Sequence, residues 1–180
     1  MGEFSVCERV QVGKGTRIMH HVNIYDCRIG DNCKIACFVE IQRGVVIGNN
    51  CKVEAFAFIP SGVEIADDVF IGPHVAFTND RVPRATGDWE ITKTVVKKGA
   101  SIGANCTVVC GVTIGENALI AAGSVVTRDV PNNALVMGCP GRIKGYICAC
   151  KNHLDVKSDS KKENRIICSK CKREIRINPK

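Results

Sequence analysis

Apolar residues recur at every sixth position over most of this 180-residue chain, a spacing that fits neither an amphipathic helix nor an alternating strand. One run extends from Ile29 to Phe77 and a second from Val96 to Val126. The anchors are Ile29, Ile35, Ile41, Ile47, Val53, Ile59, Ile65, Ile71, Phe77, Val96, Ile102, Val108, Ile114, Ile120 and Val126. A fixed short period is typical of a solenoid, in which each unit buries its apolar side against copies of itself.

A smaller residue stands four positions after each anchor, and Gly or Ala often follows the anchor directly. The hexads therefore predict short flat strands joined by tight corners, where backbones approach closely or φ is unusual. Cys33, Cys51 and Cys106 occupy the small inward positions, so we expect them to be buried packing residues.

Breaks in the six-residue period divide the chain into a first coil, a regular solenoid with one loop, and a C-terminal module. Residues 1–28 form an imperfect first coil, because the step from Ile24 to Ile29 is only five residues. The polar segment 78–95 interrupts the period and predicts a loop that leaves the solenoid, and such long loops are usually functional or disordered. We expect one domain over residues 1–146 and a small separate module over residues 147–180.

Three strings carry a family resemblance: FTNDRVPRATGDW, GASIGANCTVVCGVTIGENALIAAGSVVTRDVP and GCPGRIKG. With the sixfold period of residues 10–131, they resemble the hexapeptide-repeat acyltransferases, and within that family the N-acetyltransferases of nucleotide-linked 3-amino sugars in surface-polysaccharide synthesis. The resemblance implies an all-β, left-handed parallel β-helix in which three hexads form one coil of eighteen residues. It also implies a homotrimer with clefts between its subunits.

The implied reaction is acetyl transfer from acetyl-CoA to the amino group of a UDP- or dTDP-linked sugar. Related O-acetyltransferases place a His in the equivalent loop, whereas this loop has Asn79 and Asp80. Because a neutral amine is already nucleophilic, positioning can suffice. We expect Asn79 to hold the amine or the thioester carbonyl, with Asp80 as an optional proton acceptor. His74 is a candidate base or a structural histidine.

Further residues are candidates for substrate binding. His20 stands where the family often carries a histidine, and Arg81 and Arg84 suit a diphosphate. Trp89 can stack on a base or sugar, or fix the loop to a neighbouring subunit. Phe56 and the preceding alanine replace the paired asparagines of many family members, which leaves the sugar open.

A groove for the coenzyme is expected along one corner of the solenoid. Positions eighteen residues apart place Ala104, Ala122 and Pro140 in one column of small residues, which leaves room for a pantetheine arm. Gly138, Pro140 and Arg142 match the family's Gly-x-Pro-x-Arg pattern, and Arg142 and Lys144 can meet phosphates. The alternative is that small corner residues are only sterically required and that the basic residues are ordinary surface residues.

The C-terminal module contains two cysteine pairs, Cys148 with Cys150 and Cys168 with Cys171. These resemble a zinc ribbon, with His153 as a competing ligand. So small a module cannot stabilise itself by burial, so we expect a structural zinc ion.

Net charge and hydropathy narrow the function classes. Residues 151–180 contain ten basic and four acidic residues and so account for six of the seven net positive charges. Because the repeat region is nearly neutral, we expect no nucleic-acid partner. No apolar run approaches the roughly 20 residues of a membrane span, and no signal peptide is evident, so we expect a cytoplasmic protein without membrane association.

Three alternative functions remain open from the sequence. The first is an O-acyltransferase acting on a sugar hydroxyl. The second is a γ-type carbonic anhydrase, which needs three histidines where the solenoid offers His20, His21 and His74. The third is a non-catalytic β-helix whose ribbon binds a partner.

Overall fold

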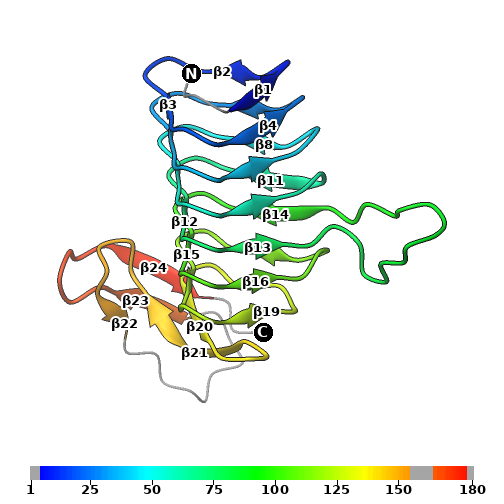
Figure 1. Ribbon diagram of the computed structural model, residues 1–180. Helices are drawn as coiled ribbons and strands as arrows, with labels where there is room; N and C mark the ends of the chain where they lie inside the picture. The colour runs from blue at the N-terminus through cyan, green and yellow to red at the C-terminus, as the bar shows by residue number, and fades with distance from the viewer. Residues whose placement is uncertain (1–4, 155–163, 178–180) are drawn as a thin grey trace.

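The computed structural model describes residues 5–154 and 164–177, and in these ranges all regular structure is β-strand. The chain winds into a three-sided parallel solenoid whose largest parallel ladder has seven strands, which confirms the predicted solenoid (Figure 1). None of the described residues forms a helix long and apolar enough to cross a membrane.

Each side of the prism is one parallel sheet, and we name the sheets A, B and C. Sheet A contains β1 (Val6–Glu8), β4 (Asn23–Tyr25), β7 (Glu40–Ile41), β10 (Phe58–Ile59), β13 (Ala76–Phe77), β16 (Thr107–Val108) and β19 (Val125–Val126). Sheet B contains β2 (Gln11–Val12), β5 (Arg28–Ile29), β8 (Val46–Ile47), β11 (Val63–Ile65), β14 (Thr94–Val96) and β17 (Thr113–Ile114).

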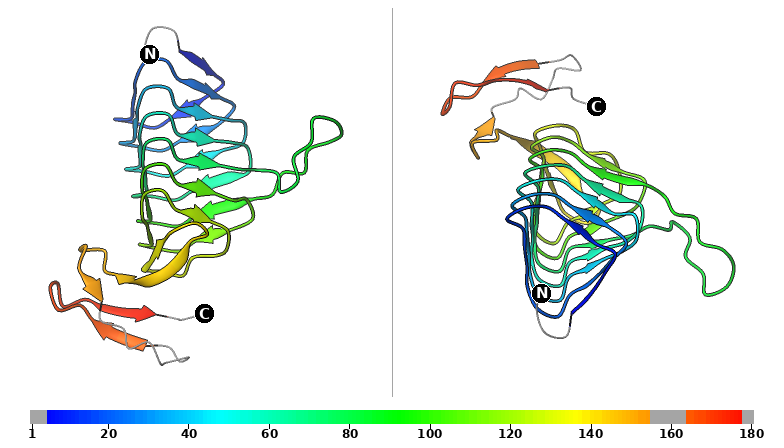
Figure 2. Two further views of the ribbon diagram at one scale, coloured as in Figure 1. Left: turned by 60° about the horizontal axis from the view of Figure 1, so that its bottom comes forward. Right: turned by 90° about the horizontal axis from the view of Figure 1, so that it is seen from above.

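Sheet C is extended beyond the solenoid by antiparallel strands. Its parallel part contains β3 (Arg17–Ile18), β6 (Lys34–Ile35), β9 (Lys52–Val53), β12 (Phe70–Ile71), β15 (Ser101–Ile102), β18 (Leu119–Ile120) and β20 (Ala134–Met137). Two antiparallel strands follow, β21 (Arg142–Ile147) and β22 (His153–Leu154). A separate antiparallel pair, β23 (Asn164–Ile167) and β24 (Glu174–Ile177), lies at the same end of the prism (Figure 2).

The register follows the predicted period and shows where it slips. Ile102 pairs with Ile120, eighteen residues on, whereas Ile18 pairs with Ile35, seventeen residues on. The short step in the first coil is therefore confirmed. In the last coil Ile120 pairs with Val136, sixteen residues on, so that this coil is two residues shorter than the regular eighteen.

The core is the stacked column of anchors with the small positions between them. All fifteen anchors are buried, and so are Cys33, Cys51 and Cys106. The thiol of Cys51 donates to the carbonyl of Ala66 at 3.1 Å, and burial raises the pKa of this thiol to about 12. These cysteines are packing residues, as predicted.

In most coils each corner of the prism has one left-handed residue, three positions after the anchor, or two positions after it in the first two coils of corner II. Corner I, between sheets C and A, has His21, Phe38, Phe56, His74, Asn105 and Gly123. Corner II, between sheets A and B, has Arg9, Asp26, Gly44, Gly62 and Gly111. Corner III, between sheets B and C, has Gly15, Asn32, Asn50, Asp68, Gly99, Asn117 and Asn133. Gly, Asn and Asp predominate because they tolerate positive φ.

The glycine directly after an anchor serves a different purpose. A Cβ at Gly48 would lie 2.7 Å from the carbonyl carbon of Ala66, and one at Gly103 would lie 2.6 Å from the nitrogen of Ala122. These positions are glycine because consecutive coils touch there, and not because φ is positive.

The expected division of the chain at residues 146 and 147 falls inside β21. This strand pairs with β20 through Ala134 and Tyr146 and with β22 through Tyr146 and Leu154. The C-terminal module is thus joined to the solenoid by a continuous strand, and its separation as a domain stays a prediction.

Candidate functional site

The interruption predicted at residues 78–95 is a loop that projects from corner II, although residues 94 and 95 already belong to β14 (Figures 1 and 2). Its neck is closed by the amide of Thr92, which donates to the carbonyl of Asn79 at 2.8 Å. One carboxylate oxygen of Asp80 accepts from the amide of Val82 at 2.8 Å. The neck therefore fixes Asn79 and Asp80, both half-buried, at the edge of sheet A.

The predicted phosphate and base contacts occupy two parts of this loop. Arg81 lies at the neck with its guanidinium group against Gly111, whose added Cβ would lie 2.8 Å from Nη2. Arg84 is exposed and donates to the adjacent Pro83 carbonyl at 3.3 Å. Trp89 is 67% exposed. Only Arg81 is therefore placed beside Asn79 and Asp80 by a contact with the solenoid.

His74 lies at corner I, the opposite edge of sheet A from the loop neck. Five residue steps separate it from Asn79, which at about 3.3 Å per extended residue is on the order of 15 Å. A single chain consequently does not bring His74 to Asn79 or Asp80. His20 is exposed in the first coil, three coils away from His74, with its ring 6.4 Å from that of His21.

A stack of four rings runs along corner I, and we call it the aromatic ladder: His21, Phe38, Phe56 and His74. Successive ring centroids are 5.1, 4.8 and 4.7 Å apart, and the planes are within 8° of parallel. Sequence reasoning missed the ladder. The seventeen- and eighteen-residue spacings of these rings were the signal, because they equal the coil lengths.

The predicted coenzyme column continues corner I beyond the ladder. Ala104 is half-buried and Ala122 is exposed, and the amide of Gly123 donates to the carbonyl of Ala104 at 2.8 Å. The expectation that Pro140 stands in the same column is wrong. Because Ile120 pairs with Val136, the residue opposite Ala122 is Gly138.

The hairpin turn between β20 and β21 carries the remaining coenzyme candidates. The amide of Gly138 donates to the hydroxyl of Ser124 at 3.1 Å, and the amide of Gly141 donates to the carbonyl of Val125 at 2.7 Å. These bonds attach the turn to the last coil. Pro140, Arg142 and Lys144 follow as exposed residues of this turn and of β21.

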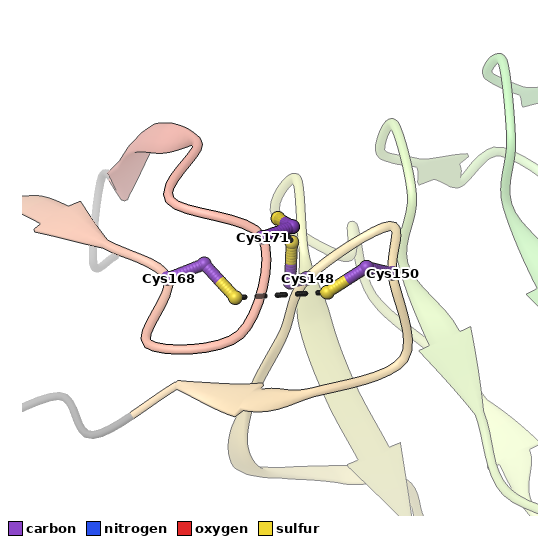
Figure 3. A group of neighbouring side chains, drawn as sticks. All are labelled: Cys148, Cys150, Cys168 and Cys171. Atoms are coloured by element: carbon purple, nitrogen blue, oxygen red, sulfur yellow. Dashed lines mark hydrogen bonds between the residues drawn. The ribbon is translucent and has the colours of Figure 1, made fainter.

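The four cysteines of the C-terminal module converge. Their sulfur atoms all lie within 4.8 Å of one another, and none of the four forms a disulfide (Figure 3). The sulfurs of Cys148 and Cys171 are 3.6 Å apart, as are those of Cys150 and Cys168. Cys148 and Cys150 lie in the turn between β21 and β22, and Cys168 and Cys171 lie in the turn between β23 and β24, so each close contact joins the two turns.

Two details bear on the cluster as a metal site. Among the described residues, His153 stands outside the converging group and its side chain is exposed. The sulfur of Cys168 accepts from the backbone amides of Cys171 and Lys170, which lowers the pKa of this thiol. Backbone amides directed at a sulfur favour the thiolate, the form that binds metal.

Comparison with known proteins identifies the repeat. The family model described as bacterial transferase hexapeptide (six repeats) matches residues 44–79 and 93–128, and that described as hexapeptide repeat of succinyl-transferase matches residues 26–60. Together the two models match half of the chain.

Curated relatives match over part of their length. The chain is 61% identical over 62 residues to the dTDP-3-amino-3,6-dideoxy-alpha-D-galactopyranose 3-N-acetyltransferase of Aneurinibacillus thermoaerophilus, which covers 34% of this chain and 32% of that protein. It is 35% identical over 84 residues to the galactoside O-acetyltransferase of Escherichia coli, covering 44% and 41%. The chain thus spans less than half the length of these relatives.

Solved structures share the fold. A variant of GDP-perosamine N-acetyltransferase from Caulobacter crescentus, in complex with CoA and GDP-perosamine, superimposes with a TM-score of 0.63 at 25% identity, covering 72% of this chain and 56% of that one. A variant of the N-acyltransferase AntD from Bacillus cereus, in complex with dTDP and coenzyme A, gives 0.69 at 23% identity, covering 79% and 83%. The solved structures show the same fold, and the two family models, together with the sixfold register, show that the chain belongs to the hexapeptide-repeat family of transferases.

Proposed function

We propose that the chain is an acetyl-CoA-dependent N-acetyltransferase acting on the amino group of a UDP- or dTDP-linked 3-amino sugar. The observation that carries the proposal is the 61% identity over 62 residues to a dTDP-3-amino-sugar 3-N-acetyltransferase. A relative crystallised with CoA and a nucleotide-linked amino sugar supports it.

The loop chemistry favours an amine acceptor over a hydroxyl. The loop between β13 and β14 contains no histidine, and its neck presents Asn79 and Asp80. The neutral amine attacks the thioester carbonyl, a carbon–nitrogen bond forms, and the carbon–sulfur bond breaks to release the thiolate. The proton lost by nitrogen passes to the carboxylate of Asp80 or to the departing thiolate.

A complete cleft requires more than one copy of the chain. Asn79, Asp80 and Arg81 stand at corner II, whereas His74 and the small-residue column of Ala104 stand at corner I. We propose a homotrimer of left-handed β-helices in which corner I of one copy faces the loop neck of the next. Acetyl-CoA then lies along corner I, with its phosphates near Arg142 and Lys144.

We further propose that the cysteine cluster holds a structural zinc ion. A tetrahedral site with Zn–S bonds of about 2.3 Å has its sulfurs roughly 3.8 Å apart, close to the 3.6 Å of the two nearest pairs. The ligands are Cys148, Cys150, Cys168 and Cys171. The ion would join the two turns, and no catalytic step involves it. We also propose, from the sequence features described above, that the enzyme is cytoplasmic.

The test offers acetyl-CoA with a panel of UDP- and dTDP-linked 3-amino sugars and their 3-hydroxy analogues, and follows release of free CoA thiol. We expect release with a 3-amino sugar and a roughly hundredfold lower rate with its hydroxyl analogue. Transfer confined to the hydroxyl analogues would reject the amine acceptor and favour the reaction named for the galactoside O-acetyltransferase relative. Hydration of CO₂ without thiol release would favour an anhydrase.

A further inference from the structure

The aromatic ladder combines backbone strain with exposed apolar rings, and no contact among the described residues of the single chain compensates for either. Phe38 and Phe56 adopt φ values of 60° and 63°, a conformation that costs non-glycine residues roughly 1–2 kcal/mol each. Both side chains are 49% exposed, because stacking covers the ring faces and leaves the ring edges open. Most residues at the other corners are Gly, Asn or Asp, which avoid both penalties. Strained residues of this kind cluster at functional contacts.

A second set of exposed apolar side chains lies on the projecting loop. Val82 stands three residues after Asn79, and Trp89 stands three residues before Thr92, so the two legs of the loop carry them at equal distance from the neck. Val82 is 64% exposed, Trp89 is 67% exposed and Ile91 is 54% exposed. Three large, exposed apolar side chains on one short loop form a patch of the kind that marks an interaction site.

The two surfaces cannot meet within one chain, because the ladder is at corner I and the loop leaves from corner II, with sheet A between them. They do lie at the same height along the prism. His74 precedes β13 in the coil from which the loop departs, and Phe56 stacks on His74 at 4.7 Å. A rotation about an axis parallel to the prism preserves height and therefore brings one copy's loop to the next copy's His74 and Phe56.

We propose that Trp89 of one copy packs against the exposed edge of Phe56 in the neighbouring copy, and that this contact fixes the loop neck against that neighbour's coenzyme column. The inference rests on the proposed trimer and specifies the contact that assembles its cleft. Three residues reach about 10 Å from the neck, enough for Trp89 to contact an adjacent corner. The interface is heterologous, and it closes into a ring with three copies. An edge-to-face contact of Trp89 with Phe56 suits aromatic geometry.

The chain contains one tryptophan, so its fluorescence reports on Trp89 alone. The test compares the wild type with Trp89→Ala and Phe56→Asn by analytical ultracentrifugation and, where the tryptophan remains, by emission and acrylamide quenching. Asn tolerates positive φ, so Phe56→Asn keeps the corner folded while removing the ring. Ile167→Asn is the control, because Ile167 is 68% exposed but lies on the ribbon strand β23.

We expect each of Trp89→Ala and Phe56→Asn to weaken trimer association at least tenfold, with little further loss in the double variant, because both remove the same contact. Phe56→Asn also shifts the emission of Trp89 to the red and increases its quenching, and Ile167→Asn does neither. If Phe56→Asn remains a trimer and its Trp89 emission is unchanged from the wild type, the proposed contact is wrong. If the emission changes when acyl-CoA binds but not when the trimer dissociates, a ligand covers the ladder and Trp89 of the neighbouring copy does not. A monomeric wild type would overturn the contact and the trimer together, whereas the thiol-release assay decides the reaction independently.

Discussion

The guanidinium group of Arg81 lies against the backbone of Gly111, so closely that a Cβ at Gly111 would stand 2.8 Å from Nη2 and 3.0 Å from the methyl carbon of Thr92. Gly111 also has a φ of 83°. The glycine therefore does two things at once: it turns corner II, and it leaves room for the arginine that borders the loop neck.

The substitution Gly111→Ala disturbs both roles, and comparison with Gly44→Ala separates them. We expect a loss of roughly 1–2 kcal/mol in the free energy of unfolding from the left-handed alanine. Displacement of Arg81 should also raise KM for the nucleotide sugar roughly tenfold, the value of one charge-assisted hydrogen bond, with KM for acetyl-CoA unchanged. Gly44→Ala is the control, because Gly44 has a φ of 78° at the same corner with nothing within 4 Å of an added Cβ. An equal rise in KM for both variants would contradict the role of Arg81.

A second prediction concerns the ion pairs that join the first coils at corner II. Asp26 accepts hydrogen bonds from Arg9 and, at 3.2 Å, from Nε of Arg43. The bond with Arg9, followed by that with Arg43, lowers the pKa of the Asp26 carboxyl from 3.8 to about 2. A carboxyl group whose pKa is lowered in the folded protein stabilises the fold at pH values above its ordinary pKa. This stabilisation is lost as the pH falls through about 2, the pKa in the folded state.

Asp26→Asn should therefore lower Tm relative to the wild type at pH 7, and this difference should shrink as pH approaches 2. Thermal unfolding of both proteins across this range, at low salt, measures it. The effect is expected to be modest because both arginine side chains are largely exposed. A Tm difference that stays constant from pH 7 to pH 2 would argue against the ion pairs as its source.

Removal of two of the proposed zinc ligands should affect the C-terminal module and leave the solenoid folded. The variant Cys168→Ser with Cys171→Ser is expected to lose about one zinc ion per chain, as measured by atomic emission. Protease sensitivity should then rise in the C-terminal module, while the far-UV circular dichroism of the coils persists. Cys168 belongs to the same buried cluster as the anchors, but it lies in the turn between β23 and β24, beyond the coils. Cys139→Ser is the matched control, since Cys139 is exposed and outside the cluster. Unchanged zinc content in the double variant would refute the site.

Thiol reactivity should follow burial along the solenoid. Burial raises the pKa of the Cys51 thiol to about 12 and that of Cys27 to about 11, and both side chains are inaccessible. We expect iodoacetamide at pH 8 to alkylate exposed Cys139 at least a hundredfold faster than Cys27 or Cys51, as read by peptide mass spectrometry. Comparable rates in the folded protein would show that the coils open readily.

The coil lengths explain which site residues could be foreseen. Ala104 and Ala122 were placed correctly in one column because the eighteen-residue register holds there. Pro140 was misplaced, because the last passage from sheet A to sheet B, from Val126 to Val130, takes four residues and not the regular six. The apolar period, which ends at Val126, does not mark that shortening. The ladder was overlooked because Phe38 and Phe56 occupy positions outside the buried period, where nothing in local sequence indicates stacking.

The sequence alone determined the solenoid, the slip in its first coil and the point at which the loop leaves it. Each of these follows from the spacing of side chains that must reach one narrow core, and such spacing is written directly along the chain. Only the tertiary structure decided that His74 and Asn79 lie at opposite corners and that four sulfurs meet from two separate turns. Those relationships depend on how many residues each corner consumes and on how the strands beyond β20 fold back, and the apolar period carries no information on either.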